Sequence, residues 1–150
     1  MFFLVLVFGI FLQEVFFTSI SRGHFTIEIF SILIIFISFY KPTVSGLLIA
    51  VFLGLLADFN LAILLGPAMI TSVMLFMVFS FLSSRLFISS NYVIFLSIFF
   101  GTIFFIATQS YIIGIFKDTE INFNLTIIYN SLFSALLAPL IIKFLQKKIF

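Results

Sequence analysis

One charged side chain, Asp58, interrupts a long run of uncharged residues from Thr43 to Ser84. Over the whole chain, hydrophobic residues make up 64% and charged residues only 8%, whereas a soluble domain has about 25% charged residues. Only a lipid bilayer solvates a surface this apolar, so the composition predicts an integral membrane protein. We expect residues 1–150 to form a single all-α transmembrane domain.

The composition also excludes several classes of function. Cysteine is absent, which rules out disulfides, thiolate metal sites and cysteine catalysis. The basic residues are scattered at predicted helix ends, which fits membrane topology and gives no reason to expect a nucleic-acid partner. The N-terminal segment has no basic start and no small-residue cleavage site, so we interpret it as a membrane helix and not as a signal peptide.

Polar breaks divide the chain into six apolar segments, and we predict six transmembrane helices. The segments are Phe2–Thr18, Phe25–Phe39, Thr43–Ala57, Ala62–Leu82, Tyr92–Ile115 and Leu125–Leu145. The second and third are short, because about 15 residues cover only about 22 Å at 1.5 Å per residue. These two either extend into neighbouring polar residues, or the third is a re-entrant or broken helix.

The distribution of basic residues predicts the orientation in the membrane. Six spans place on one side Lys41, Arg85, Lys143, Lys147 and Lys148. They place on the other side Arg22 and Lys117, with Glu28, Asp118 and Glu120. The more basic side is cytoplasmic by this rule, so we expect both termini in the cytoplasm. Asp58 then lies at the outward end of the third helix.

Two prolines mark predicted helix boundaries. Pro42 should end the second helix. Gly66 followed by Pro67 should mark a point where a helix starts or kinks.

Small residues recur every four positions on the third predicted helix, at Gly46, Ala50 and Gly54, and Asp58 continues the same stripe. Small residues at this spacing let another helix approach closely in a membrane. The stripe is either the site of a helix crossing within the chain or a docking face for another membrane protein.

Asp58 itself has three interpretations. It could be a carboxylate at a helix end in the membrane interface, with no partner. It could accept hydrogen bonds from residues such as Asn60 or Gln13 and so fix the bundle. It could be an ion or proton site, since ionisable groups in membranes are costly and often functional. An Asp58→Asn variant should be tolerated if the carboxylate only accepts interfacial hydrogen bonds.

No catalytic motif is present in the sequence. There is no nucleophile elbow, no HExxH, no phosphate-binding glycine loop and no acidic cluster for Mg²⁺. His24 and Glu28 have the spacing of a helical ligand pair, but no second histidine completes a metal site. We therefore expect no enzymatic activity, no metal and no cofactor.

Four ordered motifs give the chain a resemblance to a known family. They are Phe11-Leu12-Gln13, Phe39-Tyr40-Lys41-Pro42, Gly54-Leu55-Leu56-Ala57-Asp58, and Gly66 at its distance from Asp58. In order and spacing they resemble motifs of MreD, the rod shape-determining membrane protein of bacterial cell-wall elongation. The resemblance extends over nearly the whole chain. Together with the small-residue stripe and the Gly66-Pro67 boundary, these motifs give the candidate structural or interaction residues, which are Gln13, Pro42, Gly46, Ala50, Gly54, Asp58, Gly66 and Pro67.

The resemblance implies a non-enzymatic scaffold in the bacterial inner membrane. Its implied partners are MreC and, through MreC or directly, MreB, RodA and a class B penicillin-binding protein, besides membrane lipids. The fold of the family is similar to the substrate-binding subunits of energy-coupling-factor transporters. The alternative function is therefore a membrane subunit that binds a small, vitamin-type molecule, which would need several convergent polar groups in an outward pocket.

Overall fold

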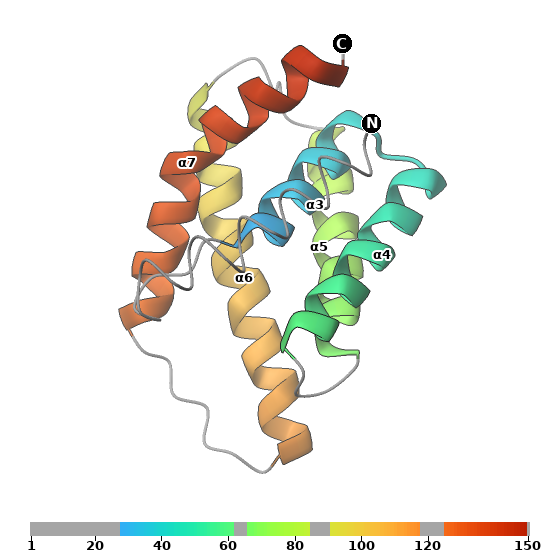
Figure 1. Ribbon diagram of the computed structural model, residues 1–150, viewed down its shortest axis with the longest axis vertical. Helices are drawn as coiled ribbons and strands as arrows, with labels where there is room; N and C mark the ends of the chain where they lie inside the picture. The colour runs from blue at the N-terminus through green and yellow to red at the C-terminus, as the bar shows by residue number, and fades with distance from the viewer. Residues whose placement is uncertain (1–27, 62–65, 85–90, 118–124, 150) are drawn as a thin grey trace.

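The computed structural model describes residues 28–61, 66–84, 91–117 and 125–149, and over these residues it is entirely helical (Figure 1). The helices are α3 (Ile29–Tyr40), α4 (Val44–Leu61), α5 (Pro67–Ser83), α6 (Asn91–Lys117) and α7 (Leu125–Ile149). The predicted all-α class is confirmed for this part of the chain. The predicted first span, Phe2–Thr18, lies outside it.

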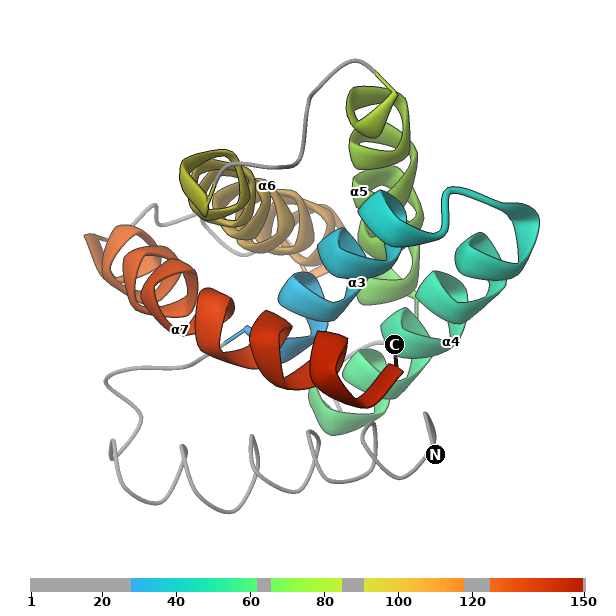
Figure 2. The same cartoon turned by 90° about the horizontal axis from the view of Figure 1, so that it is seen from above.

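Helices α4, α5, α6 and α7 alternate in direction along the bundle, as Figure 1 shows. One end of the bundle holds the end of α3, the end of α5, the start of α6 and the end of α7. The opposite end holds the end of α4, the start of α5, the end of α6 and the start of α7. Seen from above, α3 lies in the middle of the other four helices (Figure 2).

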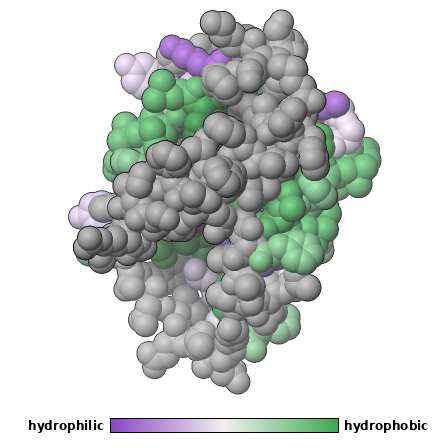
Figure 3. Space-filling view, in the orientation of Figure 1, coloured by the Kyte–Doolittle hydropathy of each residue, from purple (hydrophilic) through white to green (hydrophobic). Residues whose placement is uncertain are grey.

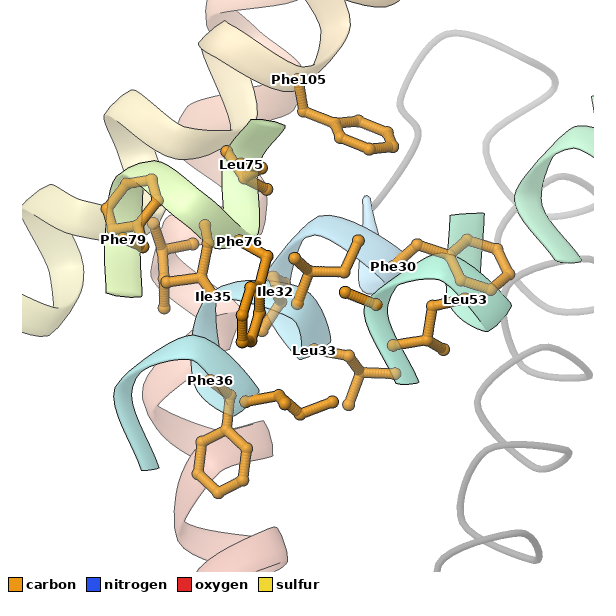
Figure 4. Close-up of a cluster of buried hydrophobic side chains, with 14 of the residues drawn as sticks. Phe30, Ile32, Leu33, Ile35, Phe36, Leu53, Leu75, Phe76, Phe79 and Phe105 are labelled. Carbon is orange, nitrogen blue, oxygen red and sulfur yellow. The ribbon is translucent and has the colours of Figure 1, made fainter. Parts of the chain in front are cut away.

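Helix α3 forms the centre of the core. Every residue in it is buried except the last, Tyr40. A helix that is apolar on all sides is stable only when other elements surround it. Figure 4 shows its side chains meeting those of the neighbouring helices, among them Leu53, Leu75 and Phe105. The ring of Phe39 on α3 packs edge-on against the ring of Phe79 on α5, with the ring centroids 5.8 Å apart.

The third apolar segment extends past Ala57 into the neighbouring polar residues, which is one of the two alternatives for this short segment. Helix α4 continues through Asp58 to Leu61, and Asp58 finds hydrogen-bond partners outside its own helix. The predicted start of the next helix at Ala62 is wrong, because α5 begins at Pro67, which fits the first position of a helix.

Two of the described helices are long and apolar enough to cross a membrane, over Tyr92–Phe116 and Leu125–Lys143. Helices α3, α4 and α5 are shorter apolar helices. The shortest of them is α3, whose 12 residues rise only about 18 Å. A bilayer core is about 30 Å thick, so α3 on its own does not cross it.

The outer faces of these helices are apolar. Figure 3 shows apolar side chains of the described helices on both sides of one face. On α6, the exposed large side chains recur at four-residue intervals: Tyr92, Leu96, Phe100 and Phe104. Surfaces of this kind suit lipid or a membrane partner better than water.

Candidate functional site at the crossing of α4 and α5

The Asp58 carboxylate connects the last turn of α4 to the first turn of α5. Its side chain is only 2% exposed. Oδ1 accepts a hydrogen bond from the backbone N–H of Ala68 at 2.8 Å. Oδ2 accepts one from Gly66 at 2.9 Å and one from Met69 at 3.1 Å. Asp58 thus accepts hydrogen bonds from three backbone amides around the start of α5. The side chains that the sequence suggested, those of Asn60 and Gln13, lie outside the part of the chain whose side chains are described.

These bonds complete the hydrogen bonding at the start of α5. The first four N–H groups of a helix have no partner within the helix. Pro67, the first residue of α5, has no N–H to satisfy. Asp58 accepts from the next two residues, and the N–H of Ile70 donates to the Gly66 carbonyl at 2.9 Å. A carboxylate at this position is also favoured by the positive end of the helix dipole.

Gly66 provides the backbone conformation that the turn requires. It is the residue before α5 and has a φ of 123°, which L residues rarely adopt. A Cβ at this position would meet nothing within 4 Å. The need for glycine is therefore conformational and not a matter of space.

Gly54, one turn before Asp58, lets the two helices approach closely. A Cβ on Gly54 would lie 2.6 Å from the Met69 Cα and 2.9 Å from the Ala68 carbonyl oxygen. These are backbone atoms, so they cannot move aside as a flexible side chain could. Close contact between small residues is a main source of helix association in membranes.

The rest of the stripe lies on the same side of α4. A Cβ on Gly46 would lie 3.1 Å from the ring of Phe76 on α5, and Ala50 is fully buried. Of the two interpretations of the stripe, the structure shows the helix crossing within the chain. Because α5 covers this face of α4, it is not free to dock another protein.

The other predicted site residues lie elsewhere. Pro42 is exposed in the turn between α3 and α4, where the N–H of Thr43 donates to the Lys41 carbonyl at 2.7 Å. The Thr43 carbonyl in turn accepts from the N–H of Leu47 at 3.0 Å, which begins α4. Gln13 lies outside the described residues.

The sequence did not identify the backbone donors of Ala68 and Met69. The sequence around Gly66 and Pro67 nevertheless indicates that this helix start needs an acceptor. Gly66 precedes a proline at the first helical position, yet it has no side chain to cap the helix. A helix start without its own cap requires an acceptor from elsewhere, and Asp58 is the nearest carboxylate in sequence.

Among the described residues, most buried hydroxyl groups donate to backbone carbonyls three or four residues earlier, so they satisfy the local backbone. They are Ser31, Ser38, Thr71, Ser72, Thr102 and Ser131. Among the described residues, no three or more His, Asp or Glu side chains come together as a possible metal site. The geometry that stands out is structural, a carboxylate and a glycine that hold two helices together.

Comparison with known proteins points to the same family as the sequence motifs. The family model for rod shape-determining protein MreD matches residues 1–148. No curated protein and no solved structure gives a significant match. The match spans nearly the whole chain, including the residues that form the crossing of α4 and α5. This chain therefore belongs to the MreD family of rod shape-determining membrane proteins.

Proposed function

We propose that this chain is a non-enzymatic scaffold of the bacterial elongation machinery, which helps determine rod shape by binding MreC. The observation that carries the proposal is the family match over residues 1–148. MreD proteins are structural, shape-determining membrane proteins, not a known family of enzymes. MreB, RodA and a class B penicillin-binding protein are the further partners in this proposal.

The proposed topology has six membrane helices in the inner membrane and both termini in the cytoplasm. The alternating directions of α4 to α7 support it, because they bring the ends of α3 and α7 to the same end of the bundle (Figure 1). These two ends carry Lys41 and Lys143, which the positive-inside rule assigns to the cytoplasm. The likeness to the substrate-binding subunits of energy-coupling-factor transporters stays a prediction, because no solved structure matches.

A membrane partner must contact a face that the bundle leaves exposed. The small-residue stripe of α4 is covered by α5, so it is not such a face. The exposed face of α6 is a better candidate, with Phe100 61% exposed. Aromatic side chains at regular helical spacing can pack against a single partner helix.

The first test is genetic. In the organism that encodes this chain, deletion of its gene should turn rods into round cells, and the wild-type chain supplied from a plasmid should restore rods. An affinity-tagged chain should also retain MreC through purification. Unchanged cell shape together with the absence of MreC would reject the proposal.

The second test maps the contact. Because the chain has no cysteine, single-cysteine variants give unambiguous crosslinks. Phe100→Cys should crosslink to a cysteine placed in the membrane helix of MreC. Ser97→Cys is the matched control, because Ser97 lies on the same helix but is buried. Equal crosslinking of the two variants would argue against a specific contact on this face.

A further inference from the structure

Glu28 lies beside the middle of a candidate membrane span. Its backbone N–H donates to Ser134 Oγ at 3.1 Å. Ser134 is the central residue of the span Leu125–Lys143 on α7. Both views of the bundle place the start of α3 next to α7 (Figures 1 and 2). This contact puts Glu28 near mid-depth if α7 crosses the membrane.

The length of α3 leads to the same depth. Glu28 and Lys41 flank the helix, and a chain segment of this length rises about 20 Å, against a bilayer core of about 30 Å. With Lys41 at the cytoplasmic surface, Glu28 ends about 10 Å short of the opposite surface. Helix α3 runs obliquely to the long axis of the bundle in Figure 1, which shortens its rise along that axis and so places Glu28 deeper still. The sequence predicts Glu28 among the outward charges, whereas the shortness of α3 supports a deeper position.

The surroundings of Glu28 offer its carboxylate little compensation. The side chain does not cap its own helix. Ser31 donates its proton to the Glu28 carbonyl at 2.8 Å, and Ser134 accepts from the Glu28 N–H. Within the described part of the chain, no ion pair or hydrogen bond reaches the carboxylate.

Charged groups on the packed helices lie far from Glu28. Lys41 follows the opposite end of α3. On α7 the described charged side chain is Lys143, about two and a half turns beyond Ser134, and Tyr129 on the same helix is exposed. On α4, Asp58 is engaged with the start of α5. Helix α5 has no ionisable side chain, and Tyr92 and Tyr111 on α6 are exposed near the two ends of that helix.

An ionised carboxylate without a partner is strongly disfavoured at this depth. A carboxylic acid that keeps its proton avoids that cost. We propose that Glu28 is an intramembrane proton-binding site between α3 and α7, occupied by a proton when the protein is in the membrane. The inference depends on the depth of α3 and α7 and not on the binding of MreC.

Dicyclohexylcarbodiimide, a lipid-soluble reagent, tests this state directly. The O–H of a protonated acid adds across one C=N bond of the carbodiimide, with the proton going to nitrogen and the carboxyl oxygen to carbon. An acyl shift from oxygen to nitrogen then gives a stable N-acylurea. The product is the sum of acid and reagent, so its mass identifies the modified residue. Glu28 is partly exposed, so a reagent dissolved in lipid can reach it.

Inner-membrane vesicles that contain the full chain are divided into two samples. One is treated with dicyclohexylcarbodiimide, and the other with a water-soluble carbodiimide and glycine ethyl ester. Peptide mass spectrometry then locates the adducts. We expect the lipid-soluble reagent to modify Glu28 and the water-soluble one to leave it unmodified. Asp58 is the internal control, because its carboxylate accepts three N–H groups and should not react.

Two outcomes would overturn the proposal. Modification by the water-soluble reagent would place Glu28 in water. No modification by either reagent would mean that the group is ionised and paired. Labelling at Glu28 should also decrease as the pH of the vesicles is raised, and the adduct should be lost in Glu28→Gln. Because the assay is read on the wild-type chain, it does not require that variant to fold, and it stays informative if MreC fails to copurify.

Discussion

Asp58 and Glu28 are both carboxylates inside the bundle, yet their surroundings are opposite. Asp58 receives three backbone N–H groups at the positive end of α5. The Glu28 carboxylate has no such donor among the described residues. Only its backbone is hydrogen-bonded, through the N–H to Ser134 and through the carbonyl to Ser31 and Ile32. The comparison teaches that the start of a helix can supply the hydrogen-bond donors that a carboxylate inside a bundle needs.

The helices around Asp58 also pack against each other more extensively than those around Glu28. Next to Asp58, Gly54 brings α4 against the backbone of α5, and contacts between these two helices are extensive. Next to Glu28, helices α3 and α7 meet over a smaller region. Substitutions at the crossing of α4 and α5 should therefore cost more stability than those between α3 and α7.

The largest effect is expected for Gly54→Leu. Its side chain would collide with the backbone of Met69 and Ala68, so the helices must separate and the contact around Asp58 is lost. We expect a loss of more than about 3 kcal/mol, seen as failure to accumulate or as a much lower unfolding temperature in detergent. Leu48→Phe is the control, because Leu48 lies on the same helix and is 63% exposed. Similar losses in both variants would contradict the close approach at Gly54.

The next test makes the same chemical change at both carboxylates. Asp58→Asn replaces one acceptor oxygen by an NH₂ group that faces N–H donors, which should cost about 2–3 kcal/mol. This reverses the tolerance that we expected for an interfacial Asp58. Glu28→Gln removes no hydrogen bond that the described residues make, so its cost should stay within about 0.5 kcal/mol. Thermal unfolding of the two purified variants provides the measurement, and equal losses would remove the distinction between the two sites.

A smaller effect is expected for Gly66→Ala. The new methyl group meets no atom, but the φ of 123° strains an L residue by about 1–2 kcal/mol. The unfolding temperature should fall less than for Asp58→Asn. The unfolding temperature of Gly66→Ser should fall by a similar amount, because the strain lies in the backbone and not in the side chain. An unchanged unfolding temperature in both variants would mean that the turn can adopt another conformation.

Ser134→Ala, between α3 and α7, should have a smaller effect than Gly66→Ala. It removes the acceptor of the Glu28 N–H and should cost about 1 kcal/mol. The matched control is Ser131→Ala, since Ser131 is equally buried but donates within its own helix to the Ile128 carbonyl. A larger loss in the control than in Ser134→Ala would argue against the contact between α3 and α7.

Much of the α4–α5 region could be predicted from the sequence. The four-residue spacing of Gly46, Ala50 and Gly54 indicates a close helix crossing, and Gly66-Pro67 marks a helix start. The sequence did not show that Asp58 caps α5, because that bond joins two helices across a turn. It also left undecided whether α4 continues through Asp58, since a charge in an apolar run normally predicts an end.

The placement of Glu28 could not be predicted in the same way. Sequence rules assign a charged residue between apolar segments to the membrane surface. Such rules assume that each segment spans the bilayer, and α3 is too short to do so.

The sequence by itself determined that this protein is helical, apolar and a member of the MreD family, because composition and motif spacing are local properties of the chain. The tertiary structure decided which face of α4 is covered, and which of two carboxylates finds hydrogen-bond donors. Those outcomes depend on which helices become neighbours, and α3 became the central one. The physical reason is that donors, close contacts and depth in a bilayer are properties of pairs of helices and not of single segments.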